Sequence, residues 1–232
     1  SRRDTCCFGS PSRSCAQVRS CSMIASETDA RAYVVARCDA QAIERLDVLA
    51  SELTAENQSQ NLIAKATLDF MWQRHIADSA QLLEHAPGDL SEPWLDLGSG
   101  AGFPGLVIAA MRPAFEVVLV ESRKRRIEWL ERAAAAMGLT NCRVEGARLE
   151  NVQSFEVAVI SARAFAPLDR LLNLSARFST KRTHWVLPKG RSAAQEVKAL
   201  PKHRRSMFHV EQSQTDPEAG IIVGRGQWSA KA

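Results

Sequence analysis

A glycine-rich segment at residues 96–105 has the composition of a nucleotide-binding loop. It reads DLGSGAGFPG and follows the apolar residues Trp94 and Leu95. A turn of this kind between a strand and a helix presents backbone N–H groups and a helix N-terminus to a ligand. The residues that allow the backbone to approach a ligand closely are Gly98, Gly100 and Gly102. The segment therefore predicts a site for a nucleotide-like cofactor.

The spacing of the glycines distinguishes two classes of cofactor. The dinucleotide fingerprint Gly-x-Gly-x-x-Gly requires glycine at position 103, where this chain has Phe103. The chain also lacks an evident substrate domain with a catalytic His and acid or a Tyr and Lys. A nicotinamide-dependent oxidoreductase is therefore the second interpretation, and a cofactor-regulated RNA-binding module without chemistry is the third.

An acidic residue ends the next apolar run. Glu121 follows the segment VVLV at 117–120. A carboxylate at this place can accept hydrogen bonds from both ribose hydroxyls of an adenosyl group. A solvated strand end would explain Glu121 alone, but the glycine loop one strand earlier favours a cofactor contact.

The elements that must position these residues alternate along the chain. After Pro93, short apolar runs alternate with helical patterns, which is typical of a parallel α/β sheet. A helical pattern over 127–137 ends at Gly138, where a left-handed cap is expected. Two closing β-like segments without a helix between them predict an antiparallel edge hairpin. The expected strands are 94–97, 117–120, 142–145, 157–160, 184–187, 205–212 and 220–224, with further helices up to Met111 and over 168–177 and 192–199.

A helical region precedes this sheet. Apolar residues recur at spacings of three and four over 30–53, as in an amphipathic helix or helix pair, and again over 68–85. A polar connector at 56–61 separates the two stretches. We therefore predict a helical N-terminal region at 23–91 and a main domain at 92–232.

Composition sets broad limits on the function. The chain has 232 residues, of which 45% are hydrophobic, so it can bury one substantial core. It has no run of eighteen apolar residues, which excludes a membrane span by sequence. The formal charge of +4 is too small to establish a nucleic-acid partner by itself.

Residues 1–22 differ from the rest in being rich in Ser, Arg and Cys, and they lack apolar periodicity. We expect them to be disordered. A transit peptide and a zinc site are alternatives, but no paired Cys-x-x-Cys knuckle is present and no metal is expected. The favoured interpretation is that Met23 is the natural initiator, so that removing residues 1–22 leaves activity unchanged. The cysteines concerned are Cys6, Cys7, Cys15 and Cys21.

Several motifs taken together resemble those of the ribosomal RNA small-subunit methyltransferase G family, also called glucose-inhibited division protein B. The resemblance covers about 30–226, and motifs in matching order are more specific than a single glycine loop. The motifs are Asn61-Leu62-Ile63, 74–79, 96–105, Glu121-Ser122 with Arg125-Arg126, Arg148-Leu149-Glu150, 161–166 and Pro188-Lys189-Gly190.

The resemblance implies a class I methyltransferase fold of the Rossmann-like type, with S-adenosylmethionine as cofactor. It implies methylation of guanine N7 in 16S ribosomal RNA, with that RNA or the small subunit as partner. By motif, Gly98 and Phe103 are cofactor contacts, Leu149-Glu150 lies beside the adenine, and Arg163 lines the active site and contributes to cofactor binding. The family often has Asp where this chain has Glu121, a longer side chain that should still reach the diol.

Basic residues provide candidate contacts to RNA. Arg123, Lys124, Arg125 and Arg126 begin the helix after Glu121, where the positive end of the helix dipole disfavours cations. Because helix stability does not explain them, we expect them to meet RNA phosphates, with a solvated helix face as the alternative. A second cluster at 202–205 is assigned to solvent.

The remaining candidates are interpreted within the matching motifs. His75 and Asp78 lie three residues apart on one helix face, so they can support the same pocket. Arg163 and Lys189 are expected to orient the guanine and nearby phosphates. Guanine N7 carries a lone pair and no proton, so no catalytic base is assigned. A cytoplasmic monomer is the expected state.

Overall fold

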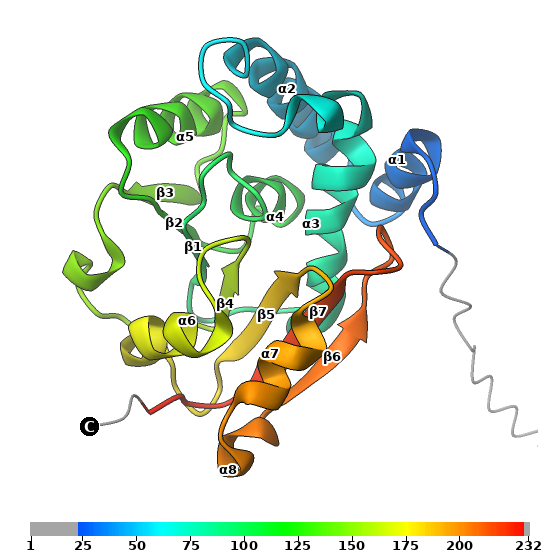
Figure 1. The fold of residues 1–232 in the computed structure, drawn as a ribbon. Coiled ribbons are helices and arrows are strands. Elements are labelled where there is room, and N and C mark those ends of the chain that lie inside the picture. Colours follow the sequence, from blue (N-terminus) through cyan, green and yellow to red (C-terminus); the bar gives the residue numbers. More distant parts are fainter. Residues whose placement is uncertain (1–22, 230–232) are drawn as a thin grey trace, which may run out of the picture.

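The computed structural model describes residues 23–229 and consists of one sheet with helices on both faces (Figure 1). The sheet has seven strands in the order β3-β2-β1-β4-β5-β7-β6. Parallel pairing joins the first five of these, and antiparallel pairing joins β5 to β7 and β7 to β6. The strands are β1 (Trp94–Leu97), β2 (Val117–Val120), β3 (Cys142–Glu145), β4 (Val159–Ala162), β5 (His184–Lys189), β6 (Phe208–Gln212) and β7 (Gly220–Arg225). The predicted α/β fold with an antiparallel edge hairpin is confirmed.

Alternate residues of the central strands enter two separate cores. On one face, Trp94 and Val117 pack with α2 (Ala40–Glu56), α4 (Gly105–Met111) and α5 (Lys124–Ala136). On the other face, Leu95 and Val118 pack with α6 (Leu168–Ser175) and α7 (Ala193–Ala199). Because both faces are covered, the central strands are mostly apolar on both faces, with Asp96 and Ser161 as buried polar exceptions.

The N-terminal region contributes to the first of these cores. The amphipathic pattern over 30–53 forms two helices, α1 (Glu27–Val35) and α2, with side-chain N-caps from Ser26 and Asp39. Leu46, Leu49 and Leu53 of α2 are fully buried against the sheet domain. The predicted boundary at 91 and 92 therefore falls within one shared hydrophobic cluster, and it stays a prediction as a domain boundary.

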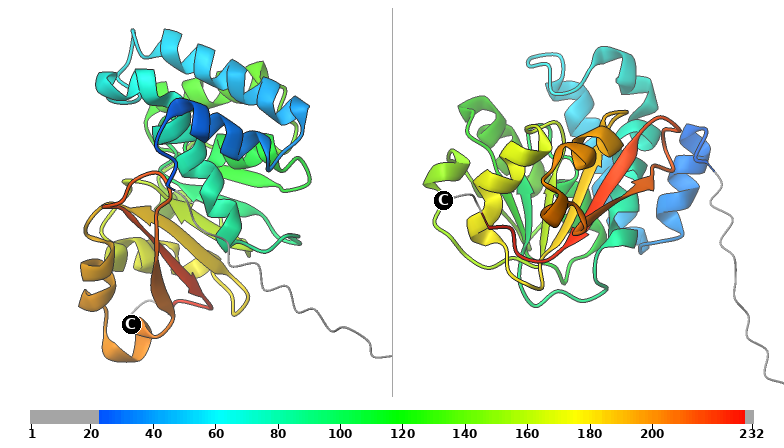
Figure 2. Two further views of the ribbon diagram at one scale, coloured as in Figure 1. Left: turned by 90° about the vertical axis from the view of Figure 1, so that its right-hand side faces the viewer. Right: turned by 60° about the horizontal axis from the view of Figure 1, so that its bottom comes forward.

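The second helical pattern forms a series of irregular turns rather than one α-helix. It comprises η1 (Lys65–Phe70), η2 (Trp72–Ala77), α3 (Asp78–Ala80) and η3 (Gln81–His85), in which η2 has π-helical hydrogen bonding. The hairpin of β6 and β7 lies beside this region (Figure 2), and the Ile24 N–H donates to Gln214 O at 2.8 Å. The start of the described chain is thus held against the turn between β6 and β7.

Several boundaries differ from expectation. Strand β4 begins at Val159, two residues after the predicted start, because 157 and 158 form loop hydrogen bonds with Phe178 and Pro93. The cluster at 202–205 forms the short helix α8 (Lys202–Arg205), and Arg204 packs over the Trp228 ring at 4.5 Å, so its assignment to solvent is wrong for this residue. Gly138 has φ +64°, as its predicted cap requires.

Two further expectations concern residues 1–22 and a membrane span. Residues 1–22, with their four cysteines, lie outside the described residues. Within 23–229, no helix is long and apolar enough to cross a membrane.

Candidate functional site

The glycine loop and Glu121 meet at the carboxyl edge of the sheet. Gly98, Gly100 and Gly102 all have positive φ, and Glu121 Oε2 accepts a hydrogen bond from the Gly100 N–H at 3.1 Å. The same carboxylate accepts from the N–H of Ser122 at 2.8 Å and from the N–H of Arg123 at 3.0 Å. The two predicted cofactor elements are therefore joined directly.

Glu121 is held as a charged acceptor. Its side chain is 4% exposed, and the Arg123 guanidinium lies 3.3 Å from Oε2. Burial raises the pKa of Glu121, but hydrogen bonds from the side chain and backbone of Arg123 outweigh burial, so the pKa lies below its usual value. A carboxylate in this state can accept a hydrogen bond from a ligand hydroxyl that displaces the exposed Arg123 guanidinium.

The glycine loop has no space for a side chain at two of its positions. A Cβ at Gly98 would lie 2.5 Å from Cδ2 of Phe165, and one at Gly105 would lie 2.1 Å from Cδ2 of Leu119. The positive φ at Gly98 is in addition strained for any L side chain. Gly98 is therefore required by both packing and backbone conformation, and Gly105 is required by packing.

Asp96 lies beneath the loop and is fully buried. Its Oδ1 accepts from the Ser161 hydroxyl at 2.8 Å, whereas Oδ2, which faces Gly105, lacks a hydrogen bond of good geometry among the described residues. Burial raises the pKa of Asp96 to about 6, although Ser161 opposes this rise. An acceptor left incompletely satisfied at the cofactor edge suits a cationic or donor group of a ligand.

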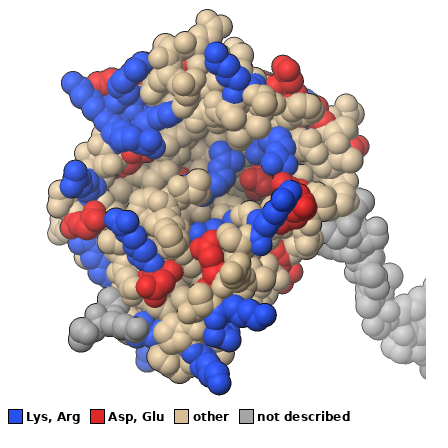
Figure 3. Space-filling view, in the orientation of Figure 1, with Lys and Arg blue, Asp and Glu red and all other residues tan. Residues whose placement is uncertain are grey.

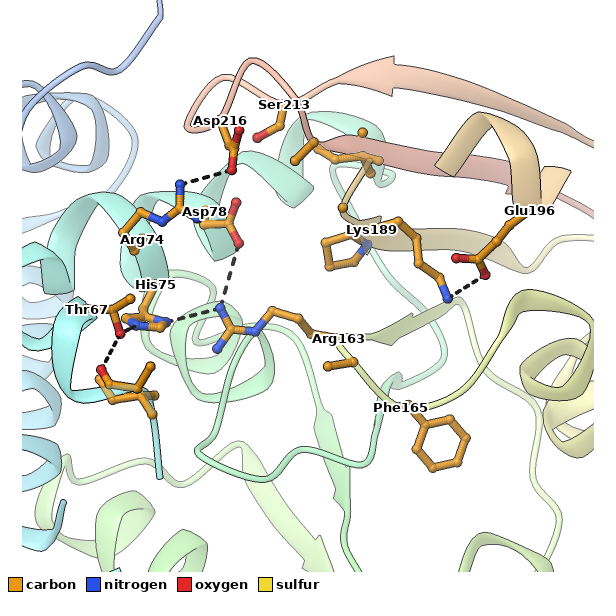
Figure 4. Close-up of a pocket in the computed structure, with 18 of the residues that line it drawn as sticks. Thr67, Arg74, His75, Asp78, Arg163, Phe165, Lys189, Glu196, Ser213 and Asp216 are labelled. Carbon is orange, nitrogen blue, oxygen red and sulfur yellow. Dashed lines mark hydrogen bonds and ion pairs between the residues drawn. The ribbon is translucent and has the colours of Figure 1, made fainter. Parts of the chain in front are cut away.

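A cavity of about 900 Å³ opens beside the loop (Figure 4). Its walls come from η1, η2 and the start of α3, from the segment after β4, from the end of β5 and α7, and from the turn between β6 and β7. Ala164, in the segment after β4, has φ +53°, a strained conformation for a residue with a side chain. The polar and charged side chains in the walls are Thr67, Arg74, His75, Asp78, Arg163, Lys189, Glu196, Ser213 and Asp216.

Arg163 lies between the glycine loop and the helical region. Its guanidinium is 4.9 Å from the centre of the Phe103 ring, and His75 stacks on the same ring at 5.0 Å between centres. Arg163 Nη1 donates to His75 Nδ1 at 3.2 Å, and it lies 3.7 Å from Asp78 Oδ2. The predicted residues 75, 78 and 163 therefore lie together in one wall, with the buried Phe103 packed behind them.

The hydrogen bonds of His75 determine its tautomer. Because the Arg163 guanidinium has only donors, Nδ1 of His75 must accept, and Nε2–H donates to Thr67 Oγ1 at 2.9 Å. The Thr67 hydroxyl donates in turn to Ala64 O at 2.8 Å. Burial lowers the pKa of His75 to about 3, with a further contribution from Arg163. His75 is therefore neutral and its acceptor nitrogen is engaged, which makes it unsuitable as a proton acceptor.

Lys189 lines the opposite wall, but its ammonium is engaged within the protein. Nζ donates to Ala166 O at 2.9 Å and to Glu196 Oε2 at 2.9 Å. The same Glu196 oxygen accepts from the Leu168 N–H at 2.8 Å. Lys189 thereby connects the end of β5 to the segment after β4, which carries Arg163 and Phe165.

Comparison with known proteins identifies the family of this site. A model of GidB, rRNA small subunit methyltransferase G, matches residues 42–218. The chain belongs to this family. The ribosomal RNA small subunit methyltransferase G of Erythrobacter litoralis is 58% identical over 205 residues, covering 88% of this chain and 99% of that protein. The protein of the same name from Novosphingobium aromaticivorans is 54% identical, covering 87% of this chain and 89% of its own length.

Solved structures support the class I fold of this methyltransferase G family member. The ribosomal protein L11 methylase of Lactobacillus delbrueckii superposes with a TM-score of 0.52 at 16% identity, covering 65% of this chain and 78% of that chain. This likeness concerns the fold alone. Family membership confirms the predicted enzyme class, an S-adenosylmethionine-dependent methyltransferase, and rules out the nicotinamide-dependent oxidoreductase.

Leu149 and Glu150, predicted beside the adenine, form the short helix η4 (Leu149–Asn151) after β3. Leu149 is 4% exposed, whereas Glu150 is exposed. Arg177 donates to both of their carbonyl groups, which holds this segment near the carboxyl edge of the sheet. Their contact with a cofactor stays a prediction.

Two arginines of the basic cluster at the start of α5 bind backbone carbonyl groups of the protein itself. Arg125 donates to Ser59 O at 3.1 Å and Arg126 donates to Asn61 O, so both hold the connector between α2 and η1. From the sequence we inferred that structural stability does not account for the cations of this cluster. That inference is wrong for Arg125 and Arg126, which hold the connector in place. Lys124 is exposed, and basic side chains gather on this part of the surface over α5 (Figure 3).

The cavity also contains residues that sequence reasoning did not assign to the site. Phe165 stood within a matching motif, which was the available signal, and it lies against Gly98. Asp216 was interpreted only as part of a turn, yet its carboxylate accepts from Arg74 at 3.1 Å in the cavity wall. No local pattern marked Thr67, Glu196 or Ser213, because each belongs to the site only through the fold.

Proposed function

We propose that the protein transfers the methyl group of S-adenosylmethionine to N7 of a guanine in 16S ribosomal RNA. The match to the methyltransferase G family over 42–218 supports the substrate. The contact between Gly100 and Glu121 supports the cofactor, because it places a charged acceptor beside a glycine cradle. This contact is the observation that carries the proposal.

The residues present fit S-adenosylmethionine. Glu121 would accept hydrogen bonds from the ribose hydroxyls, Gly98 and Gly102 would admit the ligand to the backbone, and Leu149-Glu150 would border the adenine. Asp96, buried with an incompletely satisfied oxygen, would favour the cationic end of the ligand. When bound, S-adenosylmethionine supplies an electrophilic methyl group on a positively charged sulfonium.

The chain contributes orientation rather than proton transfer. Guanine N7 has an exposed lone pair, so the reaction requires alignment of the two partners and no removal of a proton. His75 fits this mechanism because it is neutral and its acceptor nitrogen is engaged by Arg163. Arg163 would hold the base against the glycine loop, with Phe103 and His75 fixing its guanidinium.

Lys189 is proposed to act through the backbone it holds. Its bonds to Ala166 and Glu196 would keep the strained segment after β4 in place, and with it Arg163. Arg123, Lys124, Arg125 and Arg126 are proposed to lie along the path of the RNA, with Lys124 the most available to phosphates. The proposal includes a cytoplasmic monomer acting on 16S RNA or the small subunit.

A methyl-transfer assay tests this proposal. Tritiated S-adenosylmethionine is incubated with the protein and with 16S RNA, naked or in 30S subunits, from a strain that lacks the enzyme. Incorporation into 16S RNA followed by borohydride and aniline cleavage at one guanine is the expected result. Binding of the RNA without incorporation would instead indicate a cofactor-regulated RNA-binding module.

A further inference from the structure

The carboxylate of Asp78 has one engaged and one available oxygen in the cavity wall. Oδ1 accepts from the Thr215 hydroxyl at 2.7 Å and from Gln81 Nε2 at 3.0 Å. Among the described residues Oδ2 is engaged only by Arg163, whose Nη1 lies 3.7 Å away, beyond the length of an ordinary hydrogen bond. The other carboxylates in this wall and the opposite one, Asp216 and Glu196, accept hydrogen bonds on both oxygens.

The network around Asp78 determines which oxygen faces the cavity. Gln81 Oε1 accepts from the Gln214 N–H at 2.8 Å, so Gln81 Nε2 must be the group that points to Asp78. The donors from Gln81 and Thr215 therefore fix Oδ1 on the protein side. Oδ2 is left as a preorganised acceptor, beside the donor of Arg163 (Figure 4).

The order of groups along this wall matches one edge of guanine. Phe103 of the glycine loop is buried behind the Arg163 guanidinium, and from that side outward the wall presents the Arg163 donor and then the Asp78 acceptor. A guanine with N7 toward the loop presents next its O6 acceptor and then its N1–H and N2 amino donors. Adenine has an amino donor in place of O6, which would oppose the guanidinium of Arg163.

We propose that Asp78 Oδ2 accepts hydrogen bonds from N1–H and the N2 amino group of the target guanine, while Arg163 donates to O6. This specificity-determining contact rests on the proposed function, because it requires a guanine whose N7 faces the cofactor. A site that hydrogen-bonds a polar group rejects analogues lacking that group, since its own buried partner is then left unsatisfied. Asp78 and Arg163 together would thus select guanine over adenine.

Inosine provides a direct probe, because it retains N7, O6 and N1–H but lacks the N2 amino group. The methylated position is mapped first, and 16S RNA is then ligated with guanosine or inosine at that position. We expect kcat/KM of the wild-type protein to fall about tenfold with inosine, the loss of one hydrogen bond to a charged group. Equal rates with guanosine and inosine would overturn the proposal, whatever the behaviour of any variant.

The variant Asp78→Asn tests whether Asp78 causes the difference in rate between guanosine and inosine. Because Gln81 donates toward Oδ1, the asparagine amide must place its NH2 group toward the cavity, where it opposes the donors of guanine. We expect slow transfer with both RNAs and a guanosine-to-inosine ratio near one. The wild-type ratio in a folded Asp78→Asn variant would overturn the proposal. Asp69→Asn, an exposed change in η1, is the matched control and should keep the wild-type ratio.

A third RNA separates this inference from the proposed function. With 7-deazaguanosine at the mapped position, N7 is absent while the O6, N1–H and N2 groups remain. Methylation of this RNA would contradict transfer to N7 and with it both proposals. No methylation of it, together with equal rates for guanosine and inosine, would contradict the contact of Asp78 alone.

Discussion

The two sides of the site are built in different ways. Most of the cofactor side comes from one continuous part of the chain, 94–123, in which a strand, a glycine loop and the end of the next strand meet, and only the proposed adenine contacts, Leu149-Glu150, lie outside it. The cavity side combines η1 and η2, the segment after β4, the end of β5 and the hairpin turn. The cofactor side therefore depends on local backbone geometry, whereas the cavity side depends on how distant segments pack.

The largest expected effect concerns the cavity side. Arg163→Ala removes the donor to His75 and the cation beside Asp78, and we expect the single-turnover methylation rate to fall about 100-fold or more. Although the family resemblance also assigns Arg163 to cofactor binding, we expect affinity for S-adenosylmethionine to change little, because the guanidinium is engaged with His75 and Asp78 of the helical region. Arg170→Ala, an exposed change in α6, is the control. A large loss of cofactor affinity with a normal rate at saturation would place Arg163 on the cofactor side.

Glu121→Ala tests the other side of the comparison. We expect calorimetry to give a dissociation constant for S-adenosylmethionine about 10- to 100-fold higher, because charge-assisted hydrogen bonds to the ribose are lost. The single-turnover rate at saturating cofactor should fall much less. Glu131→Ala removes an exposed carboxylate from α5 and should leave the affinity unchanged. An unaltered dissociation constant in folded Glu121→Ala would remove Glu121 from the site.

The buried His75 predicts a pH dependence of stability. Its pKa is about 3 in the folded protein and 6.5 in the reference state, so the unfolded chain takes up the proton more readily. The stability that this difference contributes is fully present above pH 6.5 and is lost as the pH falls toward 3. Between pH 7 and pH 5, the wild-type protein should lose about 2 kcal/mol more than His75→Gln.

Denaturant unfolding of both proteins measures this difference. The comparison between the two proteins is needed because Asp96, whose pKa is raised to about 6, changes stability in the opposite direction over part of this range. Identical pH profiles would show that His75 is solvated. The methylation rate at saturating substrates should also stay flat from pH 6 to 9, and a tenfold rise per pH unit that is lost in His75→Gln would indicate a base.

The smallest expected effect distinguishes two cations in the same helix. Lys124→Ala should leave stability unchanged and reduce the slope of log affinity for RNA against log salt by about 1, since one phosphate contact is lost. Arg126→Ala should instead lower the thermal midpoint, because its guanidinium holds the carbonyl of Asn61. A smaller salt slope for Arg126→Ala together with a lower thermal midpoint for Lys124→Ala would show that Arg126 faces the RNA and Lys124 does not.

The sequence determined the cofactor side almost completely. Gly98, Gly100, Gly102 and Glu121 were recognisable because turn geometry and the end of a strand are local properties. The alternation of strands and helices and the edge hairpin followed from periodicity for the same reason, whereas the order of strands in the sheet was not predicted. His75, Asp78 and Arg163 were found only because they stood within matching family motifs.

Tertiary structure decided the remaining features. The tautomer of His75 depends on Arg163, which is 88 residues away along the chain. The available oxygen of Asp78 depends on Gln81 and on Thr215, which is 137 residues away. Lys189 is engaged by Glu196 instead of facing RNA phosphates, and Arg126 is engaged by Asn61. Hydrogen-bond partners across the fold set which polar atoms remain available, and a linear pattern of residue types does not specify those partners.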